Sequence, residues 1–286
     1  MAVCVDGSRN DLATPRRTAT MVVADLHVHT TNSDGTLDVA DIPAAATRAD
    51  LRAVAITDHD RPHPDLDAPL TVIDGITVVH GIELRVEATD QRVDLLGYGL
   101  DPTDALREEC ERIQQNRANR GARIVQRVED HLGIDLEVEA RPGLGRPHIA
   151  RAVAEHPAVE YDLQGVFDEL IGDDRPCFVA RDVPSFETGR RLLADACRIV
   201  GLAHPLRYDD PEAALALTAE LDAVERWYPY DRPADPGDTP ALEPVERAIK
   251  QYDLLPTGGS DAHGTSLGAA GLNADAWERV EAALDG

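Results

Sequence analysis

The sequence predicts an α/β fold, built as a parallel sheet or a barrel, with a mostly helical insertion. Short apolar runs alternate with helical patterns along most of the chain, as they do where helices join parallel strands. This rhythm stops between about Thr103 and Arg191, where helical patterns follow one another without strands. At 286 residues the chain is long enough for one large domain that carries such an insertion.

The apolar runs predict buried parallel strands, because strands covered by helices on both faces read as continuous hydrophobic segments. Helical patterns separate several of these runs, at Ala40–Ala49 and at Pro211–Leu221, where the proline suits a first helical turn. The expected strands are Met21–Leu26, Ala53–Ile56, Ile76–Val79, Val93–Leu96, Ile199–Ala203, Ala223–Trp227 and Leu254–Pro256.

The insertion is expected to be helical and to cap the barrel. It begins with a long charged helical pattern and contains shorter ones further on, separated by turn signals at Arg141–Arg146. The expected helices are Asp104–His131, Ile149–Glu155 and Leu163–Ile171.

The chain is therefore expected to divide into a barrel, formed by residues 21–102 and 192–286, and an insertion at 103–191. Residues 1–20 show no hydrophobic periodicity, and a second methionine, Met21, precedes the first strand. This segment is expected to be a disordered tail, unless Met21 is the true start.

The charge balance is strongly acidic. Acidic residues number 53 against 28 basic ones, the net charge is -25, and Lys250 is the single lysine. A carboxylate-rich surface with arginine in place of lysine favours adaptation to a salty cytoplasm, because high ionic strength screens self-repulsion; the alternative is an ordinary acidic protein. The same charge argues against a broad nucleic-acid surface, although a nucleotide can bind locally at a metal cluster.

The cysteines indicate neither disulfides nor a zinc ribbon. Cys4, Cys110, Cys177 and Cys197 lie far apart and form no CxxC pair, so reduced structural thiols are expected. No apolar run is long enough to span a bilayer, and no signal peptide opens the chain. A cytoplasmic location is expected.

The end of the first expected strand carries a candidate metal-binding pair. His27 and His29 are two residues apart, so in an extended chain both imidazoles point to one face and can reach one metal. Asp34 follows in a short polar loop that is able to fold back toward the pair. An HxH pair alone is a weak signal.

Further acids and histidines end the other apolar runs. The second run is followed by Thr57-Asp58-His59-Asp60, and such polar groups are costly to bury unless they meet water or serve a site. The third run leads to Glu83 and the fourth contains Asp94. The later runs lead to His204 and to Asp261 with His263.

Each position has an ordinary explanation, such as a helix cap or a histidine bonded to the backbone. Taken together these explanations fail, because six runs end in His, Asp or Glu at the end where a parallel barrel places its active site. Mixed imidazole and carboxylate ligands suit zinc, manganese or iron better than calcium.

From about Met21 to Gly268, this series of motifs resembles the PHP (polymerase and histidinol phosphatase) family. The motifs are DLHVHTTNSDG, AITDHD, GIE, LLGYG, GRPHIA, LAHP and GSDAH. Within the family they are most similar to the branch of small phosphoesterases that act on nucleotide 5'-phosphates and 3',5'-bisphosphates or trim short RNA from the 5' end.

The resemblance implies a distorted TIM-like (β/α)7 barrel with a trinuclear site that holds two to three divalent ions, Mn²⁺, Zn²⁺ or Fe²⁺. Glu83 would bridge two of the metals. By the same resemblance, one metal would take His27, His29, Glu83 and Asp261, a second Asp34, His59 and His263, and a third Glu83, Asp94 and His204.

One ligand departs from the family pattern. Asp94 stands where the family usually has histidine, and as a harder, charged donor it is expected to alter the preference or occupancy of the third site. His80 and His63 match no motif and are interpreted as a structural residue and as a solvent-facing loop residue, respectively.

The insertion contributes Arg146 and His148, in the motif GRPHIA. Arginine offers a planar fork for phosphate oxygens, and imidazolium can add a second donor. The family resemblance places this motif over the metals, near substrate. Arg181 is a weaker candidate that also reads as a surface charge.

The sequence thus predicts a hydrolase of nucleotide or short oligoribonucleotide phosphate esters, in which clustered metals activate a water for in-line attack and Arg146 neutralises phosphoryl charge. The leaving group would be protonated by His148 or by metal-bound water. A small phosphorylated substrate is the expected partner. The alternatives are a histidinol-phosphate-type phosphatase and a catalytically weak metal-binding scaffold.

Overall fold

The computed structural model describes residues 21–89, 91–139, 144–230 and 242–286. The expectation of a disordered tail at 1–20, or of a start at Met21, concerns a segment outside the described residues. Half of the predicted turn at Arg141–Arg146, residues 141–143, also lies outside the described residues.

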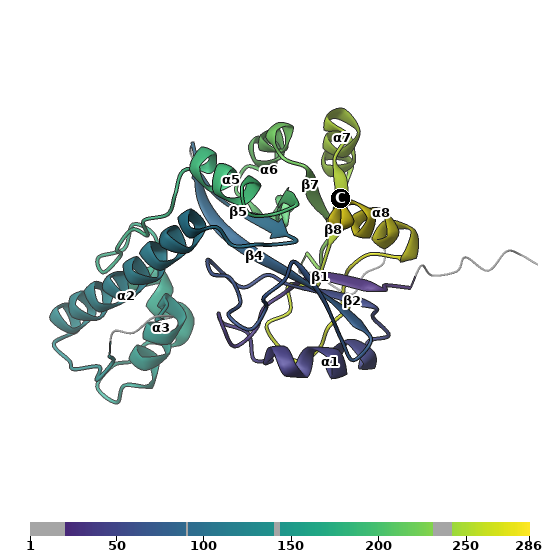
Figure 1. Ribbon diagram of the computed structural model, residues 1–286. Coiled ribbons are helices and arrows are strands. Elements are labelled where there is room, and N and C mark those ends of the chain that lie inside the picture. Colours follow the sequence, from purple (N-terminus) through teal and green to yellow (C-terminus); the bar gives the residue numbers. More distant parts are fainter. Residues whose placement is uncertain (1–20, 90, 140–143, 231–241) are drawn as a thin grey trace, which may run out of the picture.

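A single curled sheet with helices around it forms the body of the molecule (Figure 1). Its hydrogen-bonded path runs β1-β2-β4-β5-β6-β7-β8, and β3 pairs with β4 beside this path. The seven strands of the path confirm the predicted mixed α/β, TIM-like barrel fold. The strands are β1 Ala24–Val28, β2 Ala53–Ile56, β3 Leu70–Ile73, β4 Ile76–Ala88, β5 Gln91–Tyr98, β6 Ile199–Leu202, β7 Ala223–Trp227 and β8 Leu255–Gly258.

The strands are not all parallel, and this corrects the sequence-based expectation. β4 continues for 13 residues and pairs antiparallel with β5, which in turn pairs antiparallel with β6. The physical reason is the short connection between Ala88 and Gln91, since a parallel crossover needs a dozen or more residues. Hence Glu83 lies in the middle of a strand rather than at a strand end.

The barrel closes between its first strand and the segment after its last strand. Val28 bridges Ala262, and the backbone N–H of His29 donates to the carbonyl of Ala262 at 2.9 Å. The buried Asp25 carboxylate strengthens this closure, because it accepts hydrogen bonds from Ser260 N and Oγ and from Gly268 N. Gly259 permits the close approach, since a Cβ there would lie 2.3 Å from His27 N.

The helices surround this sheet and extend from it (Figure 1). The longest, α2, is capped by the Thr103 side chain and ends at Gly133, which adopts the left-handed conformation typical of a helix end. The α-helices are α1 Ile42–Arg48, α2 Asp104–Leu132, α3 Arg146–Glu155, α4 Leu163–Val166, α5 Phe186–Ala194, α6 Pro211–Ala216, α7 Glu243–Tyr252 and α8 Ala274–Asp285. Short 3₁₀ segments lie at Val39–Asp41, Pro205–Arg207 and Leu217–Glu220, and a π-helical turn at Phe167–Ile171.

The outer part of α2 packs with α3 and α4 around an apolar core of its own, which includes Ile124, Val128, Val153 and Leu170. Three further apolar clusters fill the spaces between the sheet and the remaining helices. Figure 1 shows α2 and α3 projecting to one side of the sheet. No helix in the described ranges has both the length and the apolar character needed to cross a bilayer.

Candidate metal centre

Four of the nine predicted ligands, all histidines, lie around a fifth, the buried carboxylate of Glu83. Its Oε1 lies 3.0 Å from His204 Nε2 and 3.4 Å from His27 Nε2, and its Oε2 lies 2.7 Å from His59 Nδ1. Only 1% of Glu83 is exposed, and the imidazoles around it hold the pKa of the buried carboxyl well below its usual range. A buried anion with imidazoles on several sides is suited to bridge cations.

The segment after β2 brings its donors beside Glu83 by continuing the sheet. Asp60 N donates to Glu83 O at 2.8 Å, and Glu83 N donates to Asp58 O at 3.2 Å. His59 faces Glu83, whose carboxylate outweighs the effect of burial and raises the pKa of the imidazole to about 9. The Asp58 side chain instead accepts hydrogen bonds from Thr30 and Ser33, so it fixes the loop that carries Asp34.

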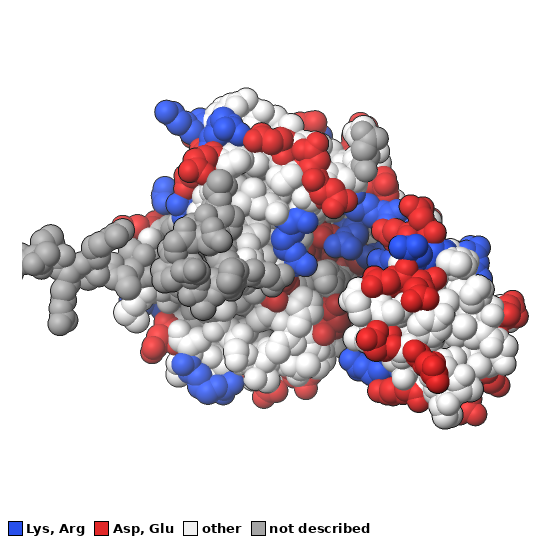
Figure 2. All heavy atoms as spheres, turned by 180° about the vertical axis from the view of Figure 1, so that it is seen from behind, with Lys and Arg blue, Asp and Glu red and all other residues white. Residues whose placement is uncertain are grey.

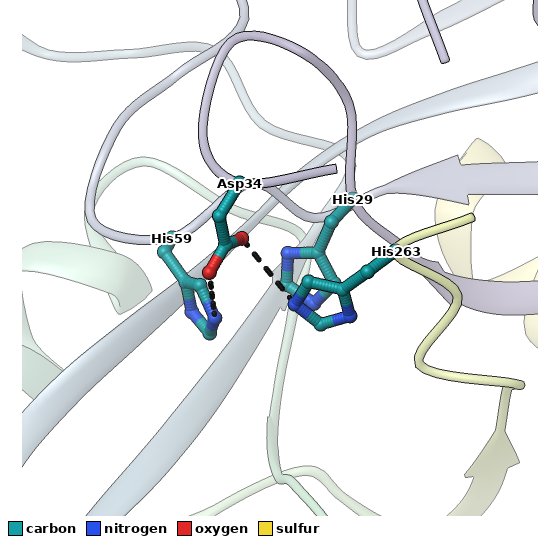
Figure 3. A group of neighbouring side chains, drawn as sticks. All are labelled: His29, Asp34, His59 and His263. Atoms are coloured by element: carbon teal, nitrogen blue, oxygen red, sulfur yellow. Dashed lines mark ion pairs between the residues drawn. The ribbon is translucent and has the colours of Figure 1, made fainter. Parts of the chain in front are cut away.

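One group of donors gathers at the mouth of the site, as Figure 3 shows. Asp34 lies between His59 and His263, with its oxygens 3.7 Å from His59 Nε2 and 3.3 Å from His263 Nε2. The ring of His29 stacks on that of His263, with 4.2 Å between the ring centroids. One ligand atom from each of these four residues lies within 4.8 Å of all the others, which is the spacing that a shared metal ion requires.

A second group lies deeper, on β1 and the segment after β8. His29 Nε2 is 3.0 Å from Asp261 Oδ1, and His27 Nε2 is 3.5 Å from the same oxygen. Asp261 reaches this position through a left-handed backbone (φ 52°). Its other oxygen accepts a hydrogen bond from the Tyr228 hydroxyl at 2.7 Å, so the carboxylate is held in place from behind.

Glu225 on β7 is a functional residue that the sequence reasoning missed. It is fully buried, its Oε1 lies 3.1 Å from His27 Nδ1, and its Oε2 accepts from the backbone N–H of His204 at 2.7 Å. Because a carboxylate only accepts, it places the proton of His27 on Nδ1 and leaves Nε2 as the free lone pair. The signal for it was a glutamate inside the apolar run at Ala223–Trp227.

The His27 Nε2 atom tests whether a cation fits here. Among the described residues it has no hydrogen-bond partner, although it is buried and faces the carboxylates of Glu83 and Asp261 at 3.4 and 3.5 Å. Such a nitrogen is satisfied by a metal ion between it and the carboxylates, or by a proton on the ring, because buried polar atoms are costly to leave unpaired; Glu225 and Glu83 raise the pKa of His27 despite its burial. The two groups around His29 therefore fit metal ions.

The third group, formed by Glu83, Asp94 and His204, differs from the other two. Its ligand atoms also lie within 4.8 Å of one another. Both oxygens of Asp94, however, accept from the guanidinium of Arg85 on the neighbouring strand, at 2.7 and 2.6 Å. Arg85 was missed in the sequence because no motif contains it.

Four arginines line the cavity in front of the donors, which has a volume of about 610 Å³. Arg85 and Arg92 come from the β4–β5 hairpin, Arg146 from the start of α3, and Arg207 from the turn after β6. Figure 2 shows basic side chains gathered where the surface is hollowed between the body and the smaller lobe, which contains α3 and the outer part of α2. Acidic side chains border them. In a chain of net charge -25, this local concentration of guanidinium groups favours an anionic ligand.

The structure separates the two candidates from the GRPHIA motif. Arg146 lines the cavity, and its guanidinium pairs with Asp173 at 2.9 Å. His148 is exposed and is absent from the cavity wall, and its Nδ1 accepts from Gly145 N at 3.3 Å as part of the cap of α3. Arg181 instead forms an ion pair with Asp60.

The two histidines without a motif lie apart from the cluster. His80 accepts from the backbone N–H of His63 at 3.2 Å, and burial lowers the pKa of His80 to about 4. His63 is only 5% exposed, so it is a buried residue rather than the solvent-facing loop residue that was expected.

This fold and these donors define the protein as an enzyme of the metal-dependent hydrolase class, with its centre inside a TIM-like barrel. Residues 25–134 match the family model described as the PHP domain. Over these residues the chain is similar to PHP domains, which confirms the resemblance in the sequence, and the protein is a metal-dependent phosphoesterase.

Curated relatives with stated activities span most of the chain. It is 29% identical over 206 residues to the 3',5'-nucleoside bisphosphate phosphatase of Chromobacterium violaceum, covering 66% of this chain and 69% of that protein. It is 28% identical over 261 residues to the phosphoribosyl 1,2-cyclic phosphate 1,2-diphosphodiesterase of Eggerthella lenta, with 85% and 95% covered. A 5'-3' exoribonuclease of Haemophilus influenzae is 26% identical over 255 residues, with 84% and 89% covered.

A solved structure supports the fold. The crystal structure of a presumed metal-dependent phosphoesterase from Bifidobacterium adolescentis aligns with a TM-score of 0.69 over 92% of this chain and 96% of that one, at 24% identity.

Proposed function

We propose that this enzyme hydrolyses phosphate esters of nucleotides, namely 5'-nucleotides, 3',5'-nucleoside bisphosphates or the 5' ends of short oligoribonucleotides. The observation that carries the proposal is the presence, in one cavity, of clustered imidazole and carboxylate donors and four arginines. The donors suit metal ions, and the arginines suit a substrate with more than one phosphate. The activities named for the relatives point to the same substrates.

The proposed ligands of two ions are seven of the nine residues predicted from the sequence, and the proposed ions are Mn²⁺, Zn²⁺ or Fe²⁺. His29, Asp34, His59 and His263 would hold one ion at the mouth, and His27, His29, Asp261 and Glu83 would hold another deeper in the site. Bound ions would lower the pKa of a water molecule and neutralise charge on the phosphoryl group.

The side chains of this chain would then orient the reaction. Glu225 keeps His27 in one tautomer, and Tyr228 holds Asp261, so both donors are fixed before substrate binds. Arg146 would bind phosphoryl oxygens from the insertion side of the cavity. His148 remains a proposed proton donor to the leaving group, and because it is exposed in this structure this role requires α3 to approach the metals.

The experiment compares a double variant with a matched control. His27→Ala with His29→Ala removes two buried donors from β1 and is expected to abolish metal binding and metal-dependent phosphate release, a loss of several kcal/mol or about 10³-fold. His131→Ala with His156→Ala removes two histidines outside the site and is expected to retain both properties. Retained turnover in the first variant would contradict the proposed function.

The substrate class is tested with four compounds under the same conditions. Adenosine 3',5'-bisphosphate and a 5'-phosphorylated oligoribonucleotide are expected to be turned over faster than histidinol phosphate. Preferred turnover of histidinol phosphate would favour the alternative phosphatase. Ribose 1,2-cyclic phosphate 5-phosphate tests the activity that the Eggerthella lenta relative suggests. Bound metal without turnover of any ester would favour the scaffold alternative.

A further inference from the structure

The third donor group contains a two-pronged pair of opposite charges, whereas Asp261 of the second group is reached by Arg207 through a single contact of 3.3 Å. Arg85 on β4 and Asp94 on β5 are direct partners in the antiparallel register. The Arg85 Nε lies 2.7 Å from Asp94 Oδ1, and its Nη2 lies 2.6 Å from Oδ2. Two parallel bonds of this kind form the planar fork in which arginine binds a carboxylate most strongly.

Burial makes this pair permanent. Asp94 is 1% exposed, and both of its carboxylate oxygens are bound by the Arg85 guanidinium, so its charge is paired within the protein. Arginine stays protonated at any working pH, so the positive charge beside Asp94 cannot be removed as an imidazole proton can. A divalent ion that binds Asp94 would have to lie next to this fixed charge.

The same guanidinium lies near the common bridge of the centre and opens onto the cavity. It belongs to the wall of the 610 Å³ cavity together with Glu83 and His204, and 40% of the Arg85 side chain is exposed. His204 Nε2 lies 3.7 Å from Asp94 Oδ2, the same oxygen that accepts from Arg85 Nη2. The Arg85 guanidinium thus provides, from within the chain, a positive charge at the third group.

We infer that this enzyme holds two metal ions, and that the Arg85 guanidinium replaces a third ion as the positive charge of the Glu83, Asp94 and His204 group. One edge of the guanidinium binds Asp94 through two of its five N–H bonds, and the remaining three are available on the cavity side, where they bind phosphoryl oxygens of the substrate. This inference rests on the proposed function for its phosphate-binding part, but not for the number of ions.

The first measurement is the number of metal ions per chain, by elemental analysis of protein equilibrated with excess Mn²⁺ and then desalted. The expected value is two for the unaltered chain and three for the double variant Arg85→Ala with Asp94→His, which removes the guanidinium and adds an imidazole. The double variant leaves no unpaired buried carboxylate at position 94, so it is expected to fold. Arg226→Ala is the matched control, because Arg226 forms a similar ion pair with Glu246 outside the cavity.

The second measurement separates phosphate binding from metal binding. At saturating Mn²⁺, Arg85→Ala is expected to raise KM for adenosine 3',5'-bisphosphate by roughly 10-fold or more, and added methylguanidinium is expected to restore part of the loss. Three ions in the unaltered chain, or two in the double variant, would overturn the inference and leave the proposed function intact. No bound ion in the unaltered chain would overturn both.

Discussion

Two buried carboxylates lie side by side in this molecule, and their surroundings differ. Glu83 is surrounded by imidazoles, with His59 Nδ1 and His204 Nε2 at 2.7 and 3.0 Å. Asp60, whose N–H donates to Glu83 O, is surrounded by guanidinium groups, with Arg181 in direct contact and Arg117 at 3.7 Å. Both acids are 1% exposed.

The charged partner of a buried acid decides what that acid can do. An imidazole can release its proton and turn a lone pair toward a metal ion, whereas a guanidinium has no lone pair to offer and stays charged. Glu83 therefore belongs to a centre that can exchange protons for metal, and Asp60 belongs to a set of permanent ion pairs. Because Arg117 lies on α2 and Arg181 follows α3 and α4, the ion pairs of Asp60 connect these helices to the sheet.

The largest expected effect comes from breaking the ion pairs of Asp60. Asp60→Asn leaves two half-buried guanidinium groups without their carboxylate, so we expect the free energy of unfolding to fall by about 3 kcal/mol. Metal content should not change. Urea unfolding of metal-free protein measures the first quantity, and elemental analysis the second.

Asp74→Asn is the matched control for this change. Asp74 is exposed, and its backbone has the same left-handed conformation as that of Asp60, with φ of 50° against 53°. Since asparagine tolerates this conformation, the control isolates the loss of charge pairing. Equal unfolding midpoints for the two variants would show that the ion pairs of Asp60 do not stabilise the fold.

A smaller effect is expected from weakening the hydrogen bond between Glu225 and His27. Glu225→Gln keeps the shape of the side chain but no longer fixes the proton of His27 on Nδ1, so we expect metal affinity to fall by roughly 10- to 100-fold. Mn²⁺ titration by calorimetry measures the change. Glu246→Gln, at an exposed glutamate that pairs with Arg226, should bind Mn²⁺ as the unaltered chain does. Unchanged affinity in Glu225→Gln would remove Glu225 from the centre.

The smallest effect concerns the acidic surface, which neither buried cluster shares. With a net charge of -25, self-repulsion should weaken as the Debye length falls from about 10 Å at 0.1 M to about 3 Å at 1 M KCl. We expect a gain of about 1 kcal/mol, which corresponds to a Tm increase of roughly 2–4 °C. Thermal unfolding in a KCl series measures it, and a Tm that rises only above 1 M would indicate general salting-out instead of screening.

The fold class and the gathering of nine donors could be predicted because strand ends and motifs mark them in the sequence. The strand directions could not, because the continuation of β4 through Glu83 and the hairpin to β5 depend on pairing that apolar runs do not reveal. Arg85 and Glu225 were missed for a related reason. Each acts through a neighbour on another strand, at Asp94 and at His27, and such partners become visible only once the register is known.

The closure of the barrel sets an order of events during synthesis. His27 and His29 leave the ribosome more than 200 residues before Asp261 and His263, and the later pair is positioned only when Ser260 and Gly268 bond to Asp25. Contacts of such high sequence separation form slowly. A nascent chain that has already exposed its first two histidines therefore cannot yet hold a complete centre.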